Sequence, residues 1–177
     1  MLSGALYDAS DPELTEMRRR ARRLTRAYNA TSEDEDAQRE HLLRELFGRL
    51  GAQPAIEPPF YCDYGCHIFA GDRFYMNFGC VVLDPGEVHF GDRVMVGPGV
   101  QIVTATHPLA AAERALGPEG ARPIRVGSDV WVGAGAIICP GVTIGDGTTI
   151  GAGSVVVKDL PAGVLAVGNP ARVLRSI

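Results

Sequence analysis

The residue best suited to chemistry in this sequence is His107, which stands before Pro108 in the segment TATHP. The proline favours an extended backbone at the histidine. An imidazole has a proton affinity that suits removal of a proton from an alcohol near neutral pH. Residue type and position alone leave two interpretations open: a general base, or an ordinary histidine of a loop.

The other histidines and the cysteines give weaker signals. His41 and His89 are expected at the surface, whereas the place of His67 is ambiguous. The four cysteines are Cys62, Cys66, Cys80 and Cys139. They form no CxxC pair and have no histidine partner at the spacing of a zinc site, so we expect free buried thiols and no bound metal. Free thiols also fit a reducing compartment.

The element that would position these residues is a repeat that runs from Val126 to Val157. A β-branched residue recurs at every sixth position, and glycine or another small residue fills much of the rest. The repeated residues are Val126, Val132, Ile138, Ile144, Ile150 and Val156. A helix repeats about every 3.6 residues and a strand about every 2, so neither explains the pattern. The period is typical of a parallel β-helix, in which these side chains point into a shared interior.

The repeat begins weakly and is interrupted where His107 lies. The same period is found earlier at Ala70, Met76 and Val82, is interrupted by two extra residues in PGEVH, and resumes at Phe90, Val96 and Ile102. Ile102 and Val126 are 24 residues apart, a multiple of six, so the coil can resume in phase around an extruded loop, residues 104–123. An excursion of this length from a rigid scaffold is more often functional than accidental.

A first amphipathic helix is predicted near the start of the chain. Asp11 and Pro12 are typical of a helix start, with aspartate as N-cap and proline in the first helical position. Apolar residues at helical spacing continue to about Asn29. The opposite face carries Arg18, Arg19, Arg20, Arg22, Arg23 and Arg26. We interpret this face as solvated.

A second helix is predicted to follow, with Ser32 and Glu35 as a capping box, and to end near Gly48 or Gly51. Two short helices cannot bury a core alone. We expect residues 1–55 to form a helical cap that covers the open first coil, and residues 56–177 to form the β-helix with a basic C-terminal tail.

Composition excludes several classes of protein. The chain has 177 residues and a formal net charge of −4, and no basic patch covers a repeat block, which argues against nucleic acid as a partner. The N-terminal segment does not resemble a signal peptide, and no apolar run approaches the length of a membrane span. We expect a soluble, cytoplasmic protein of one domain with a small appendage.

Several longer motifs occur in a specific order and spacing. They are LYDASDPEL, PPFYCDYG, NFGCVVLD, TATHP, VWVG, PGVTIGDG and GNPAR. In these motifs, across almost its whole length, the chain resembles the hexapeptide-repeat sugar O-acetyltransferases of the maltose, galactoside and nodulation-protein group, and most closely the maltose acetyltransferases. The resemblance implies a left-handed β-helix that assembles as a homotrimer with active sites between neighbouring subunits.

The resemblance also implies a reaction. His107 would be the general base that removes a proton from a sugar hydroxyl, whose oxygen attacks the thioester of acetyl-CoA directly. No nucleophilic residue is needed for a direct transfer, which agrees with the absence of a GxSxG motif.

Four further residues are implied at the acceptor. Asn77 matches the family asparagine that lies between acceptor and thioester, where its amide can donate and accept. Asp63 stands where the galactoside enzymes have serine, and its carboxylate can bind sugar hydroxyls. Tyr75 is expected nearby, either stacked on a sugar face or packed in the core. Asp11, or alternatively Asp8, would supply a further acceptor contact.

The implied contacts to coenzyme A are Asn77, Ala134, Ala152, Val157, Lys158, Arg172 and Arg175. Ala134, Ala152 and Lys158 would form one wall of the groove, and the two arginines would meet the nucleotide phosphates. Ala134 replaces a family serine and Val157 a family threonine, so the contact at Ala134 would use a backbone N–H. Trp131 would line the pantetheine channel or a subunit interface.

Two alternatives to a sugar O-acetyltransferase remain open at this point. The same fold serves other acceptors, such as an antibiotic, an amino sugar or serine. A non-transferase hexapeptide-repeat protein is the other alternative, with the γ-class carbonic anhydrases as the metal-binding example. Such a zinc site needs clustered histidines, and His67, His89 and His107 form no obvious set.

Overall fold

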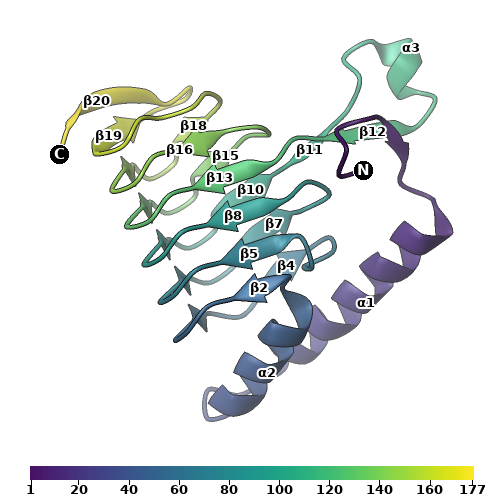
Figure 1. The fold of residues 1–177 in the computed structure, drawn as a ribbon, viewed down its shortest axis with the longest axis horizontal. Coiled ribbons are helices and arrows are strands. Elements are labelled where there is room, and N and C mark those ends of the chain that lie inside the picture. Colours follow the sequence, from purple (N-terminus) through teal and green to yellow (C-terminus); the bar gives the residue numbers. More distant parts are fainter.

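Three sheets wind around one core to form a parallel β-helix, and the computed structural model describes all of residues 1–177 (Figure 1). Successive strands of the chain enter different sheets, and each strand pairs in parallel with its equivalent one coil away. The β-helix predicted from the six-residue period is therefore confirmed.

Each sheet is named here after its strand in one central coil. The β7 sheet contains β4 (Tyr61–Cys62), β7 (Val81–Leu83), β10 (Gln101–Val103), β15 (Ile137–Ile138) and β18 (Val155–Val156). The β8 sheet contains β2 (Arg49–Leu50), β5 (Ile68–Ala70), β8 (Val88–Phe90), β13 (Ile124–Val126) and β16 (Thr143–Ile144). The β9 sheet contains β3 (Ala55–Ile56), β6 (Tyr75–Met76), β9 (Met95–Val96), β14 (Trp131–Val132), β17 (Thr149–Ile150), β19 (Val164–Val167) and β20 (Arg172–Ser176).

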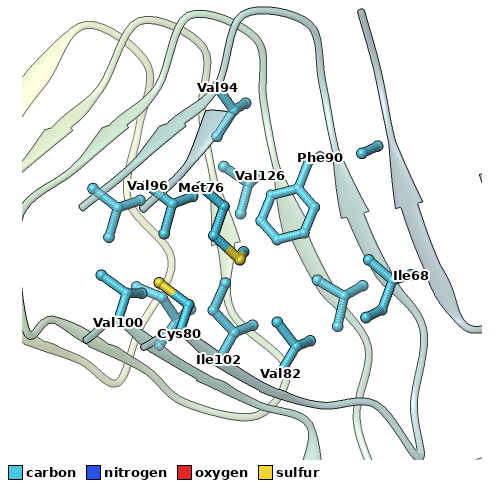
Figure 2. Close-up of a cluster of buried hydrophobic side chains, with 14 of the residues drawn as sticks. Ile68, Met76, Cys80, Val82, Phe90, Val94, Val96, Val100, Ile102 and Val126 are labelled. Atoms are coloured by element: carbon cyan, nitrogen blue, oxygen red, sulfur yellow. The ribbon is translucent and has the colours of Figure 1, made fainter. Parts of the chain in front are cut away.

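The core is the column of aliphatic side chains inside the coil. All residues of the six-residue period from Ala70 to Val156 are buried. Figure 2 shows Met76 of the β9 sheet and its counterparts Val82 and Ile102 of the β7 sheet pointing into the shared interior. Burial of this apolar surface, at roughly 25 cal/mol per Å², is the main favourable contribution to folding.

The chain turns at three corners in each coil, and each corner is named after one residue. They are the Asn77 corner (residues 77–80), the Asp84 corner (residues 84–87) and the Asp92 corner (residues 91–94), each with the residues that stack on it in other coils. Glycine is required where corners stack closely: a Cβ on Gly133 would lie 2.6 Å from the backbone nitrogen of Ala152.

Two helices cover the first coil, as predicted (Figure 1). Helix α1 spans Pro12–Asn29, and the Asp11 carboxylate accepts from the first backbone N–H groups as an N-cap. At its other end, the Asn29 side chain donates to the Phe60 carbonyl at 2.9 Å and accepts from the Phe60 N–H at 2.8 Å. The cap is therefore joined to the coil by hydrogen bonds as well as by apolar packing.

Helix α2 spans Asp36–Leu46, and its start was predicted wrongly. Glu35 occupies the N-cap position, and no side chain caps the helix. The Glu35 carboxylate instead accepts from the N–H and hydroxyl of Ser32, because the chain makes a separate turn between these two residues.

The β-helix begins earlier than the predicted boundary at residues 55 and 56. Strands β2 and β3 already lie in the sheets, and the N–H of Gly48 and that of Gly51 donate to carbonyls of the next coil. The helical cap is therefore shorter than residues 1–55. The predicted boundary lies too late because the first coil contains only weakly apolar repeats.

The extruded loop has secondary structure of its own. It contains β11 (Ala105–Thr106), α3 (Ala111–Arg114) and β12 (Pro118–Ala121). Strand β12 pairs antiparallel with β11 and with β1 (Tyr7–Asp8) from the N-terminal segment. The loop and the N-terminus therefore form one small sheet beside the coil (Figure 1).

The other end of the coil is closed by a hairpin. Strand β20, which contains Arg172 and Arg175, pairs antiparallel with β19, so the expected tail is part of a sheet. None of the helices has the length and apolar character needed to cross a membrane.

Candidate active site

A cleft of about 320 Å³ lies where the extruded loop, the N-terminal segment, α1 and the Asp84 corner meet. It is lined by Tyr7, Ala9, Arg18, Asp63, Tyr64, Leu83, Pro85, Ala105, His107 and Glu119. Two predicted site residues, His107 and Asp63, are thus brought into one cleft although 44 positions separate them in the sequence.

The extruded loop positions His107, which follows β11 and is exposed in the single chain. The base of this loop is anchored by Thr104, which is fully buried. Its hydroxyl donates to the Leu83 carbonyl and accepts from the Gly86 N–H, both at 2.8 Å. The imidazole is therefore presented from a fixed strand, as a proton-transferring group requires.

Asp63 offers a carboxylate that makes no hydrogen bond within the chain. Its backbone N–H donates to the Asp84 carboxylate at 3.0 Å. Burial raises the pKa of Asp63, and the positive charge of Arg18 partly opposes this rise. Both oxygens can therefore accept hydrogen bonds from hydroxyl groups that enter the cleft.

Arg18 also lines the cleft, so the prediction of a fully solvated arginine face is wrong for this residue. Its guanidinium donates to the Tyr64 hydroxyl at 2.8 Å and to the Ala9 carbonyl at 2.6 Å. Position 18 faces the Asp84 corner, whereas Arg19 and Arg23 make exposed ion pairs with Glu16.

Tyr7 and Glu119 also line the cleft. The Tyr7 hydroxyl donates to Glu119 Oε2 at 3.0 Å, and the two residues are paired across β1 and β12. Burial and the Glu119 carboxylate both raise the pKa of Tyr7. Sequence reasoning missed Arg18, Tyr7 and Glu119, because only the long-range pairing of the loop with the N-terminus brings them together.

Three further predicted residues lie on a different edge of the coil. Asn77 belongs to the Asn77 corner, where its side-chain oxygen accepts from the Phe78 N–H at 2.7 Å. Ala134 and Ala152 stack on the same corner, both exposed, and the Gly153 N–H donates to the Ala134 carbonyl at 2.8 Å. None of these three residues lines the cleft of His107.

The distance between the Asn77 corner and the Asp84 corner follows from the length of the strand that joins them. Asn77 precedes β7 and Asp84 follows it, so one strand of the β7 sheet separates the two corners. At about 3.3 Å per residue, this strand and its flanks span roughly 15 Å. His107 and Asn77 therefore do not lie close together within one chain.

The expected wall of Ala134, Ala152 and Lys158 is likewise divided. Val157 and Lys158 follow β18 and are exposed at the Asp84 corner, across the β7 sheet from the two alanines. Arg172 and Arg175 are exposed on β20, at the end of the coil. The cationic side chains and the alanine stack thus lie on different surfaces of one chain.

Two predicted acceptor contacts are not in the cleft. Tyr75 lies on the outer face of the β9 sheet, between Ala55 and Met95 in the ladder, so it is not near Asp63. Asp11 is engaged as the N-cap of α1, and Asp8 accepts from Ser10, because both residues serve the local turn before the helix.

His67, His89 and the four cysteines do not line the cleft. His67 is buried and its Nδ1 lies 2.7 Å from the Asp84 carbonyl, while His89 stacks on Phe69. All four cysteines are free, but only Cys80 is fully buried, so the predicted burial is wrong for the other three, which are half-buried. The chain contains no group of three or more His, Cys, Asp or Glu side chains that could hold a metal ion.

Comparison with known proteins gives consistent matches. A family described as "Maltose acetyltransferase hexapeptide capping motif" matches residues 1–51, and "Bacterial transferase hexapeptide (six repeats)" matches residues 123–158. Nodulation protein L of Rhizobium meliloti (strain 1021) is 48% identical over 98% of this chain and 94% of its own length.

Solved structures agree with these matches. A maltose O-acetyltransferase from Clostridium difficile 630 superposes with a TM-score of 0.99 at 48% identity, covering 99% of this chain and 94% of its own. The hexapeptide-repeat acetyltransferase VCA0836 from Vibrio cholerae O1 biovar eltor, complexed with acetyl coenzyme A, gives 0.94 at 39% identity, with 99% and 95% covered.

Proposed function

This chain belongs to the hexapeptide-repeat family of acetyl-CoA-dependent O-acetyltransferases, and on that premise we propose that it transfers an acetyl group to a sugar hydroxyl with His107 as general base. The observation that carries the proposal is the cleft itself. It is lined by the accessible imidazole of His107 and by the Asp63 carboxylate, which has no hydrogen bond within the chain.

The proposed reaction is a direct transfer. His107 takes the proton of the acceptor hydroxyl as the oxygen attacks the carbonyl carbon of the thioester. The tetrahedral intermediate then collapses, the C–S bond breaks, and the imidazolium returns its proton to the sulfur of coenzyme A. A backbone N–H near Ala134 and the amide of Asn77 would stabilise the negative oxygen of the intermediate.

The cleft supports a polyhydroxyl acceptor. The Asp63 carboxylate has no partner in the chain, and Glu119 uses one oxygen for Tyr7. Carboxylate oxygens only accept hydrogen bonds, so they select donors such as sugar hydroxyls. Maltose, glucose and galactosides are the acceptors to test first, and amino sugars, antibiotics and serine form the alternative set.

We propose a homotrimer as the active form, because one chain places His107 and Asn77 on different corners. A neighbouring chain that presents its Asn77 corner to the Asp84 corner would complete the site. The β9 sheet has an outer column that suits such contact: Met95 and Trp131 are adjacent and 51% and 52% exposed. Exposed apolar residues gathered in this way mark interaction surfaces.

Substitution of His107 by alanine tests the mechanism. With acetyl-CoA and each sugar, release of free coenzyme A is followed with a thiol reagent. We expect H107A to lower kcat by about 10² to 10⁴ while the KM for acetyl-CoA stays nearly unchanged. H41A, a change at an exposed histidine of the cap, is the control and should retain full activity. Unchanged turnover in H107A would exclude His107 as the base.

A further inference from the structure

We propose that Asp84 is a positioning residue that fixes the Asp63–Tyr64 turn of the cleft from behind. This inference rests on the proposed function of the cleft but concerns a residue that does not line it. Asp84 is fully buried, whereas the cleft is bordered by its neighbours Leu83 and Pro85.

The contacts of Asp84 all lead to one segment of the neighbouring coil. Its Oδ1 accepts from the backbone N–H of Asp63 at 3.0 Å and from that of Tyr64 at 2.9 Å. Its backbone carbonyl lies 2.7 Å from Nδ1 of His67, which must therefore carry the proton of this bond. One residue thus holds both the beginning and the end of the turn formed by residues 63–67.

Burial of the Asp84 carboxylate lowers the stability of the folded chain. Asp84 Oδ2 is buried without a hydrogen-bond partner, and no other buried side-chain nitrogen or oxygen of the protein lacks one. Burial raises the pKa of Asp84 to about 6, since two N–H groups and the nearby His67 only partly offset the loss of water. A buried carboxylate kept at such cost, directly behind the cleft, is expected to have a role in the site.

The proposed role of Asp84 follows from the two residues of the turn, Asp63 and Tyr64, that line the cleft. The side chain of Asp63 has no hydrogen bond of its own, so its place in the cleft depends on its backbone. The Tyr64 hydroxyl accepts from Arg18, which in turn binds the Ala9 carbonyl of the N-terminal segment. Release of the turn would therefore move the acceptor side of the cleft, and displacements of about 1 Å are enough to impair catalysis.

The Asp92 corner of the same coil supplies a matched control. Asp92 accepts from the backbone N–H of Asp72 at 2.9 Å, a bond of the same kind between neighbouring coils. Neither residue lines the cleft. A D92A variant therefore removes a corner hydrogen bond without touching the proposed site.

The test compares D84A, D84N and D92A in steady-state kinetics with the best sugar acceptor. We expect D84A to raise the KM for the acceptor by about tenfold, because hydrogen bonds that fix the turn are lost, and to leave the KM for acetyl-CoA within about twofold. In D84N the amide oxygen still accepts from both N–H groups, so the acceptor KM should return to within about threefold of wild type. D92A should leave both KM values unchanged.

Two further measurements make the test decisive. D84E keeps the oxygens but adds a methylene that displaces the turn, so it should show the same split in KM if D84A does not fold. Hydrogen exchange at the Asp63 and Tyr64 amides, which needs no acceptor, should be fast in D84A and D84E relative to wild type and slow in D84N.

The proposal is overturned if D84N raises the acceptor KM as much as D84A, or if D84A and D92A behave alike in kinetics and exchange. A wild-type protein that releases no coenzyme A with any sugar would instead refute the proposed function. In that case the exchange pattern still decides whether Asp84 holds the turn.

Discussion

Two variants that are each inactive should restore activity when they are combined in one trimer. The variants are H107A, which lacks the proposed base at the cleft, and N77A, which lacks the amide at the Asn77 corner. Within one chain a strand of the β7 sheet separates these two positions. A complete site in the proposed trimer would therefore take His107 from one chain and Asn77 from its neighbour.

The expected recovery follows from this geometry. In a trimer that contains both variants, one of the three interfaces pairs an intact His107 with an intact Asn77, whichever variant contributes two chains. Activity of the doubly tagged trimers should then reach about one third of wild type. Each variant alone should retain about one hundredth or less, since it lacks a proton-transferring or oxyanion-stabilising group. If one chain supplied both residues, mixing would restore nothing.

The assay needs mixed trimers of known composition. The two variants are co-expressed with different affinity tags, and tandem purification isolates trimers that contain both. Sedimentation gives the oligomeric state, and sugar-dependent release of coenzyme A gives the activity. Each variant carrying both tags, co-expressed and purified in the same way, is the control. Doubly tagged trimers that remain at the activity of the single variants would refute the division of the site between chains, as would a fully active monomer.

Three further predictions concern stability and assembly. N29A removes both hydrogen bonds between the cap and Phe60, and should lower the free energy of unfolding in urea by about 2 kcal/mol; a loss no larger than that of the exposed S32A would show that these bonds do not hold the cap. The pKa of Asp84 is raised from 3.8 to about 6, so the folded state binds this proton more tightly and wild type loses stability as pH rises through this interval. D84N should therefore gain stability relative to wild type between pH 4 and pH 7, by up to about 3 kcal/mol at about 1.4 kcal/mol per pKa unit, and a pH-independent difference in urea unfolding would contradict this. W131E places a charge in the exposed column of the β9 sheet and should shift the sedimentation profile toward monomer. R125E, on the exposed face of the β8 sheet, is the control and should leave the profile unchanged. A trimer that persists in W131E would place the interface elsewhere.

The coil could be predicted from the sequence because its rule is local. Val132 and Ile138 are buried for the same reason as every other member of the period, and each coil repeats the contacts of the one before. The start of α1 is local as well, since the Asp11 carboxylate caps N–H groups only two and three residues away. Weak repeats hid the first coil, so the boundary of the cap was placed too late.

The site was only partly predictable, because its residues meet through long-range pairing. Tyr7 and Glu119 are 112 positions apart and become partners only when the extruded loop folds against the N-terminal strand. Arg18 is likewise not fully solvated, because the Asp84 corner packs against its part of α1 and Tyr64 accepts a hydrogen bond from it.

The sequence by itself determined the β-helix, its helical cap and its family resemblance, and it singled out His107 as the proposed base. Only the tertiary structure decided which corner each residue occupies. The six-residue period tells whether a side chain points inward, but the corner depends on how many residues each turn contains, including the extra ones before Val88 and after Thr104. This is why Asn77 and His107, joined by resemblance to one reaction, lie on opposite edges of the β7 sheet in a single chain.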